Sequence, residues 1–363
     1  MQMISFNHTI NYVNCSVPVL ILPPDRLSTK FYLTSIPFII IFVSIQMGIL
    51  LDLEVLKEIV RRPIAVAIGF FCQYGLMPII AFAITKIFHY PPLYGFGLFV
   101  VGCCPGGSAS NQLTVIFDGD LNLSVLMSFA STLASFVIMP LWLYTLGTHA
   151  YLRHLKMHIP FRGLMKSLAT IVVPLCIGMI IAYFLPKIKP FFKRIVKPIL
   201  ILLMIYFFSF GTYVNFYLFK YIDLRMALTT PLLPWFGYLL GGAVAWMFGQ
   251  DWIRIKTIGI ETGIQNVGIA FMVLLNSLPE PENNQATVIA IIISYLSSQP
   301  FYAILLINLI RKRCCKKQLH DTQPTTTVNI NLENSIDNDF ECQTKCNEIT
   351  TIPVSLMGNS REL

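Results

Sequence analysis

The sequence has 363 residues, of which 55% are hydrophobic and only 12% are charged. Soluble domains carry about a quarter charged residues, so this composition excludes an ordinary soluble enzyme. The formal net charge of +8 would favour nucleic-acid binding in a soluble protein. Here the Lys and Arg residues lie at the ends of apolar blocks, where membrane proteins carry their orientation signals. We therefore expect an all-α polytopic membrane protein that binds no nucleic acid.

The apolar blocks are each long enough to cross a hydrocarbon core about 30 Å thick as a helix. The sequence predicts nine such spans, at residues 32–53, 64–86, 93–117, 121–145, 164–185, 198–219, 229–248, 255–278 and 286–310. They define a transmembrane domain at residues 32–310, which follows a tail at 1–31. The tail at 311–363 is polar with little apolar periodicity, and we expect it to be disordered.

The two tails predict the orientation of the chain. N-glycosylation acceptors occur at Asn7 and Asn14, and the basic segment Arg311–Lys317 directly follows the last span. Lys and Arg are more frequent beside the predicted inner ends of the spans, although the basic loop at 146–163 is predicted outside. We expect a multi-pass protein, in the plasma membrane, with an extracellular glycosylated N-terminus and a cytoplasmic C-terminus. Whether Cys314 and Cys315 are palmitoylated is left open.

The third span is interrupted at mid-membrane depth. An apolar run from Tyr94 to Cys104 meets the sequence Pro105-Gly106-Gly107-Ser108-Ala109-Ser110-Asn111-Gln112, which combines helix breakers with polar groups. A continuous helix is not expected there. Backbone groups freed in a bilayer are tolerated only where they are buried in protein or line a cavity, so the break marks a candidate site.

The eighth span repeats this pattern between Gly259 and Gly268. The two interrupted spans are five spans apart, and an odd separation inverts the second copy in the membrane. The sequence thus predicts an inverted repeat of four plus five helices, at about residues 32–145 and 164–310, in which the fifth span has no partner. Inverted repeats whose broken helices meet at the midplane are typical of secondary transporters. If either break is considered by itself, the alternative is that its glycines serve only for close packing of helices.

Glu261 is the acidic residue that lies well inside a span. A charge at the bilayer centre costs several kcal/mol unless it is paired or protonated, so a metal cation or a proton is expected beside it. The other polar groups near the breaks are uncharged oxygens, on Gln73, Ser110, Asn111, Ser124, Ser128, Thr262 and Gln265. One carboxylate with neutral oxygen ligands suits weak, reversible binding of a hard monovalent cation, and this set favours sodium.

Five segments resemble the sodium/bile acid cotransporter family: Cys104–Asn111, Gly119–Ser124, Met139–Leu141, Ile159–Gly163 and Glu261–Asn266. The resemblance covers about residues 32–310. It implies a core domain with two crossed discontinuous helices, a panel domain, and alternating access coupled to two sodium ions. Carried over by motif, one sodium site consists of Ser110, Asn111, Ser124, Ser128 and Glu261. The other consists of Gln73, Glu261, Thr262, Ile264 and Gln265, with Thr262 and Ile264 acting through their carbonyl oxygens.

The substrate is expected beside the breaks, because the N-terminal ends of half-helices carry partial positive charge and can meet an anionic group. The residues expected there are Ser108, Asn266 and Gly268. The segment Val267–Phe271 is almost entirely apolar, so we expect binding mainly by shape and apolar contact. A bile acid, a steroid sulfate or another amphipathic organic anion remains open.

The leading hypothesis is a sodium-coupled symporter of an amphipathic organic anion. Proton coupling through Glu261 is the alternative within transport, and a non-transporting receptor or scaffold that keeps the fold is the alternative outside it. The sequence has no HExxH zinc pair and no G-x-S-x-G nucleophile motif, so an enzyme is not expected. The expected partners are the anion, sodium ions and membrane lipid, and homo-oligomerisation is left open.

Overall fold

A computed structural model of the chain describes residues 27–50, 63–107, 109–153, 161–219, 222–279 and 282–307, together with residue 310. The chain divides into two compact units, at residues 1–298 and 299–363. All the sites discussed below belong to the first unit. The predicted glycosylation, substrate and lipidation residues Asn7, Asn14, Ser108, Cys314 and Cys315 lie outside the described residues.

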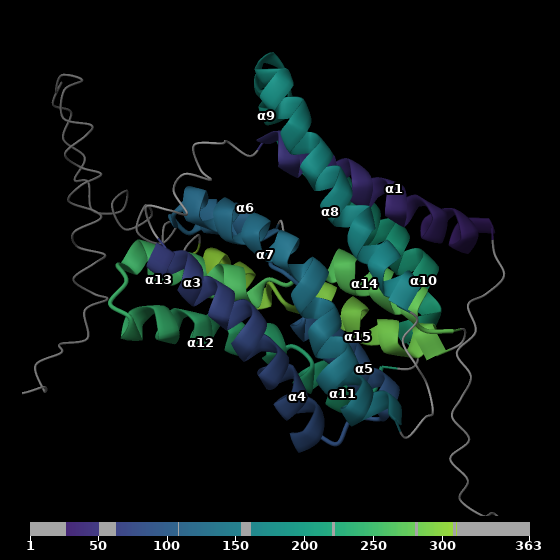
Figure 1. The fold of residues 1–363 in the computed structure, drawn as a ribbon. Coiled ribbons are helices and arrows are strands. Elements are labelled where there is room, and N and C mark those ends of the chain that lie inside the picture. Colours follow the sequence, from purple (N-terminus) through teal and green to yellow (C-terminus); the bar gives the residue numbers. More distant parts are fainter. Residues whose placement is uncertain are drawn as a thin grey trace, which may run out of the picture. The chain divides into compact units, whose positions relative to one another are not determined.

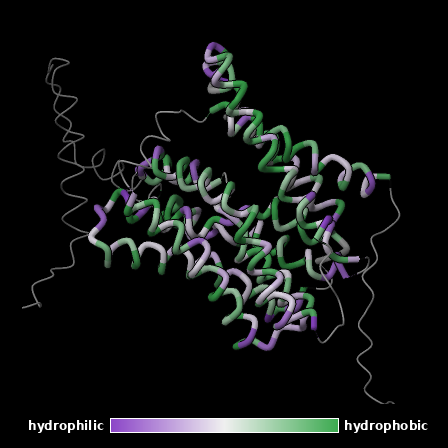
Figure 2. Tube along the Cα trace, viewed as in Figure 1, coloured by the Kyte–Doolittle hydropathy of each residue, from purple (hydrophilic) through white to green (hydrophobic). Residues whose placement is uncertain are grey.

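The described part of the chain is helical, apart from one antiparallel bridge between Gly106 and Gln265. Within it, six helices are long and apolar enough to cross a membrane: Leu27–Leu50, Pro63–Ile87, Leu121–Leu152, Phe161–Phe184, Leu224–Met247 and Glu282–Ile307. Two further apolar helices, Pro92–Gly102 and Val267–Ser277, are shorter. Hydrophobic residues run along the length of the helices in Figure 2. The prediction of an all-helical, multi-pass membrane protein is confirmed, while the count of nine spans stays a prediction.

The helices follow one another along the chain as labelled in Figure 1. Their bounds are α1 (Leu27–Leu50), α3 (Pro63–Phe71), η1 (Cys72–Leu76), α4 (Met77–Ile87), α5 (Pro92–Gly102), α6 (Ala109–Ile116), α7 (Leu121–Trp142), η2 (Leu143–Leu152), α8 (Phe161–Phe184), η4 (Pro186–Ile188), α9 (Lys189–Ile205), η5 (Tyr206–Gly211), α10 (Thr212–Phe219), α11 (Leu224–Thr229), α12 (Leu232–Met247), α13 (Trp252–Gly263), α14 (Val267–Ser277) and α15 (Glu282–Leu296).

Two helix boundaries differ clearly from the sequence prediction. The fourth span was expected to end at residue 145, but the helix continues through the π-helical turns of η2 to Leu152. Buried packing extends it, because Tyr151 lies against Phe99 with ring centroids 5.6 Å apart. The sixth span was expected to begin at residue 198, whereas α9 begins at Lys189. Its first turns are basic, so hydropathy locates the apolar part of the helix but not its start.

Close helix pairs hold the first unit together. Helices α1 and α8 cross where Gly48 faces Gly178, and an added Cβ on either residue would overlap backbone atoms of the other helix. Helices α12 and α13 also run side by side (Figure 1). Small residues at helix crossings allow such close backbone approach in a membrane. Helices α5, α14 and α15 supply much of the main apolar core, and this core supports both interrupted helices.

Candidate functional site

Both predicted interruptions are present, and they pair with each other. Helix α5 ends at Gly102 and α6 begins at Ala109, while α13 ends at Gly263 and α14 begins at Val267. Across the breaks, the Gly107 amide donates to the Ile264 carbonyl (2.8 Å), and the Asn266 amide donates to the Pro105 carbonyl (2.9 Å). Backbone groups freed by the two breaks therefore satisfy each other in the interior, where water is scarce.

Glu261 lies near the end of α13, directly beside the paired breaks, and is only 2% exposed. Its carboxylate accepts hydrogen bonds from the hydroxyls of Ser110 (2.6 Å), Ser124 (2.8 Å) and Ser128 (2.5 Å). Ser110 belongs to α6, and the two other serines lie one turn apart on α7. The Ser124 hydroxyl also lies 2.8 Å from Asn111 Oδ1. The five residues predicted for one cation site are thus brought together around one buried carboxylate.

Gln73 joins the second span to both breaks. Its side-chain amide donates to the Cys104 carbonyl (2.7 Å) and to Gln265 Oε1 (2.8 Å), and the Gln265 amide donates to the Thr262 carbonyl (2.8 Å). The Thr262 hydroxyl instead bonds back to its own helix at Ile258 (2.7 Å). At Thr262 the carbonyl oxygen is therefore the atom that faces the other predicted ligands, and the predicted second set is also contiguous.

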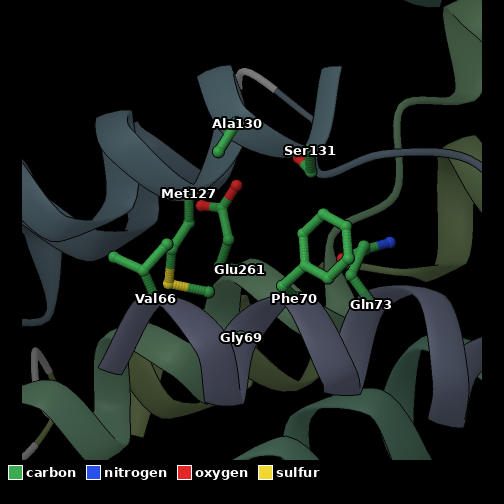
Figure 3. A pocket seen from close by; sticks show the side chains of 8 residues that line it. All are labelled: Val66, Gly69, Phe70, Gln73, Met127, Ala130, Ser131 and Glu261. Carbon is green, nitrogen blue, oxygen red and sulfur yellow. The ribbon is translucent and has the colours of Figure 1, made fainter. Parts of the chain in front are cut away.

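A small cavity lies beside Glu261, with a volume of about 10 Å³. Its walls come from α3, η1, α7 and α13, through Val66, Gly69, Phe70, Gln73, Met127, Ala130, Ser131 and Glu261. In Figure 3 the Glu261 carboxylate lies between the helix that carries Val66 and Phe70 and the segment that carries Met127, Ala130 and Ser131. A volume of roughly 10 to 15 Å³ holds one water, so the cavity matches a single water-sized species.

The sequence reasoning missed Ser131, which lines this cavity. The Ser131 hydroxyl donates to the Ser128 carbonyl (3.1 Å) and lies 3.4 Å from the Gly106 amide, which donates to it. Ser131 follows Ser124 and Ser128 at helical spacing, and residues three and four apart share one helix face. The recurrence of serines at this spacing was therefore the sequence signal that could have identified Ser131.

The basic side chains of α13 do not neutralise Glu261. The Lys256 ammonium donates to the carbonyls of Phe117 and Asp118, and Arg254 pairs with Asp251 at 3.4 Å. The described residues contain no group of three or more His, Cys, Asp or Glu that could hold a metal ion. The site offers one carboxylate with hydroxyl, amide and carbonyl oxygens, which suits a hard cation.

Two of the three predicted substrate residues, Asn266 and Gly268, lie beside the second break. Asn266 caps α14, where its side-chain oxygen accepts from the Ile269 amide (3.2 Å). Gly268 lines a cavity of about 260 Å³ between α1, η5, α10, α14 and α15. The other lining residues are Tyr32, Ile36, Ile40, Gly211, Asn215, Val267, Phe271, Ala290, Ile291, Ser294 and Tyr295. The structure therefore separates a polar site at Glu261 from a larger, mainly apolar cavity at Gly268.

A helical membrane protein with two interrupted helices that meet around a buried carboxylate has the features of a secondary transporter. Residues 37–222 match the Sodium Bile acid symporter family. The chain belongs to this family, whose members are transporters and not enzymes.

Relatives extend the similarity beyond residue 222. The ileal sodium/bile acid cotransporter of Cricetulus griseus is 32% identical over 302 residues, which is 81% of this chain and 84% of the relative. The hepatic sodium/bile acid cotransporter of Homo sapiens is 30% identical over 247 residues, or 67% of this chain and 70% of the relative. The sodium-dependent organic anion transporter of Bos taurus is 32% identical over 234 residues, which span 63% of this chain and 60% of the bovine protein.

Proposed function

We propose that the protein is a sodium-coupled symporter of an amphipathic organic anion that works by alternating access. The burial of Glu261 supports this most strongly. The carboxylate is 2% exposed and accepts three serine hydroxyls, and neither cationic side chain described on α13 contacts it. Serine hydroxyls stabilise a carboxylate but do not neutralise it. A buried ion needs a counter-charge, and a dissolved cation supplies one reversibly.

Two sodium ions fit the two contiguous groups of oxygens. Ser110, Asn111, Ser124, Ser128 and Glu261 form the first proposed site, and Gln73, Glu261, Thr262, Ile264 and Gln265 form the second. Each group combines the shared carboxylate with uncharged oxygens, which favours a monovalent cation over a tightly bound divalent one. Serine hydroxyls and the Gln265 amide donate to oxygens of these two groups, so sodium bound at these oxygens would replace hydrogen bonds.

The paired breaks support the inverted repeat. Each break gives one amide and one carbonyl to the other, through Gly107 to Ile264 and Asn266 to Pro105. This reciprocal exchange is the pattern expected of two equivalent segments related by a local two-fold axis. In the proposed nine-span protein, the interrupted helices belong to a core that moves against the panel, and the sodium sites move with the core.

The cavity at Gly268 indicates the chemistry of the substrate. None of its lining residues is charged, and Ile36, Ile40, Val267 and Phe271 give it apolar walls. Such walls suit the body of an amphipathic molecule, whose anionic group would lie near the amides at the start of α14. The matched relatives are named for bile acids and organic anions, so we propose a bile acid or steroid sulfate type of substrate.

Uptake in cells with and without sodium tests the proposal. Radiolabelled taurocholate and a steroid sulfate are offered in sodium medium and in medium where choline replaces sodium. We expect saturable uptake of at least one of these anions, and we expect choline to abolish it. Uptake that survives choline and follows an inward proton gradient would favour proton coupling through Glu261. If no anion is taken up although the protein is at the cell surface, the receptor or scaffold alternative is favoured.

The substitution Gly268→Leu tests the substrate path. The atoms nearest to a Cβ at this position are side-chain atoms: Asn266 Oδ1 at 3.3 Å, a tight contact that a small shift of this side chain would relieve, and Ile40 atoms at 3.7 Å or beyond. The leucine side chain is therefore expected to project into the cavity that Gly268 lines. We expect uptake to fall by at least about tenfold, because even a few lost apolar contacts are worth over 1 kcal/mol. Sodium should still stabilise the purified variant against heat. Normal uptake by Gly268→Leu, or loss of the sodium effect, would place the substrate elsewhere.

A glycosylation assay tests the proposed topology in the plasma membrane. Asn7→Gln and Asn14→Gln should each remove a glycan if their acceptors are extracellular, and a tag after Leu363 should react with antibody only after cells are permeabilised. A C-terminal tag that antibody reaches on intact cells would overturn the orientation and, with it, the inverted pairing of spans.

A further inference from the structure

The turn between α6 and α7 is fastened to α13 on the side of the site away from the breaks. Lys256 of α13 donates to the backbone carbonyls of Phe117 (2.7 Å) and Asp118 (3.0 Å). Thr257 is the next residue and is fully buried, and its hydroxyl accepts from the Asp120 amide at 2.8 Å. We call this set of contacts the Lys256 clamp.

The turn has a geometry that exposes carbonyls to a cation. Asp118 adopts a left-handed conformation with φ of 52°. The Gly119 amide donates to the Thr114 carbonyl (2.7 Å) and the Asp118 amide to the Val115 carbonyl (3.3 Å). This is the Schellman pattern that ends a helix. The last carbonyls of a helix are available to groups outside it, and the negative end of the helix dipole lies there, so an ammonium group is favoured.

The clamp joins the helices that supply the groups around the carboxylate. Helix α6 carries Ser110 and Asn111 and ends at the clamped turn, while α7 begins with Asp120 as its cap and carries Ser124. Glu261 follows Lys256 on α13, and helical spacing separates the two by little more than one turn. Two sets of contacts therefore hold α6 and α7 against α13. The serine hydroxyls bind the Glu261 carboxylate, and the clamp holds the turn between α6 and α7.

We propose that Lys256 is a positioning residue for the sodium site. It acts through backbone carbonyls, keeping α6 and α7 at the separation from α13 at which their oxygens and the Glu261 carboxylate share a cation. It does not touch the ion. This inference rests on the proposed function, because it assigns to Lys256 a role in sodium binding.

Sodium titration of the purified full-length protein tests the clamp. Thermal stability is followed as sodium replaces choline at constant ionic strength. We expect Lys256→Met to raise the half-saturating sodium concentration about tenfold, the scale of a lost hydrogen bond to a charged group. Uptake at saturating sodium should stay within about twofold of wild type, because the ligands themselves remain. Lys256→Arg keeps the charge and the donors, and should restore the half-saturating concentration to within about threefold of wild type.

Arg254→Met is the matched control. It removes a positive charge from the same helix two residues away, and Arg254 pairs with Asp251 and not with the α6–α7 turn. We expect the half-saturating sodium concentration of this control to equal that of wild type. An equal shift in both variants would mean that general charge near the site matters and not the clamp, which would overturn the proposal.

The remaining outcomes are also distinct. A Lys256→Met protein with wild-type sodium affinity, or with lower maximal uptake at unchanged affinity, would contradict the positioning role. If Lys256→Met and Lys256→Gln both fail to fold while Arg254→Met folds, Lys256 is a folding residue and the proposal falls. If wild type itself shows no sodium effect, the proposed function fails first, and the clamp has no sodium site to position.

Discussion

Glu261→Gln is expected to abolish sodium-dependent uptake while the protein still reaches the cell surface. Glutamine preserves the volume, and its one carbonyl oxygen can still accept from Ser110 and Ser124 while its amide NH2 donates to the Ser128 hydroxyl, so packing around α13 is conserved. The substitution removes the charge that both proposed sodium sites share. Hydrogen bonds to charged groups are each worth about 1.5 to 3 kcal/mol, and loss of the ion's own carboxylate should weaken sodium binding by at least about a hundredfold. Initial rates of uptake, normalised to surface protein, measure the effect.

Asp251→Asn is the matched control for Glu261→Gln. Asp251 lies at the start of the same helix, is exposed, and caps it through the Arg254 amide (3.2 Å). Asparagine caps a helix as well as aspartate does, so the variant loses only a charge remote from the site and its exposed ion pair with Arg254. We expect near-normal uptake from this variant. If Glu261→Gln loses surface protein in proportion to uptake, Glu261 serves folding, and if it keeps full sodium dependence, the assignment is wrong.

Gly106→Ala is expected to impair sodium coupling nearly as strongly, although Gly106 has no side chain to bind an ion. A Cβ at this position would overlap the Glu261 carboxylate. The backbone there is fixed by the bridge to Gln265, so the carboxylate must move away from Ser128 to admit a methyl group. We expect sodium-dependent uptake to fall at least about tenfold, since overpacking costs about 1 to 3 kcal/mol. Sodium-dependent thermal stabilisation of the purified variant should fall with it.

Gly242→Ala provides the comparison for this glycine variant. Gly242 lies on α12, which packs against α13, and a Cβ there would meet its nearest atom, Ile255 Cγ2, at an ordinary 3.7 Å. We expect uptake close to wild type. If Gly106→Ala couples sodium as well as Gly242→Ala does, the carboxylate is not confined between the breaks as described.

The interruptions and the central acid could be predicted from the sequence because each depends on local chemistry. Pro105 and the glycines that follow it cannot continue a helix well, and a lone carboxylate among apolar residues needs a partner wherever it lies. The spacing of Ser124 and Ser128 in the sequence is enough to predict that they share one face of a helix. The family resemblance then assigned Gln73, which is distant in sequence and has no local signal of its own.

Other features could not be predicted because they depend on pairs of segments far apart in the chain. The hydrogen bond between the Gly107 amide and the Ile264 carbonyl forms only when the two interrupted helices meet, and no residue pattern encodes it. Lys256 lies close to Glu261 in the sequence, but its role could not be predicted. Its partners are backbone carbonyls of the turn after α6, and a residue of any type could supply these. The cavity at Gly268 likewise draws its walls from distant helices. Tyr32 and Asn215 belong to its lining only through tertiary packing.

Direct binding of radioactive sodium to the purified protein tests the central claim, which is that a dissolved cation neutralises Glu261. The account predicts saturable binding to wild type that unlabelled sodium displaces and choline does not. It also predicts that Glu261→Gln loses this binding while Asp251→Asn keeps it. Saturable sodium binding of equal strength in Glu261→Gln would contradict the account, as would wild-type protein that transports its anion but binds no sodium.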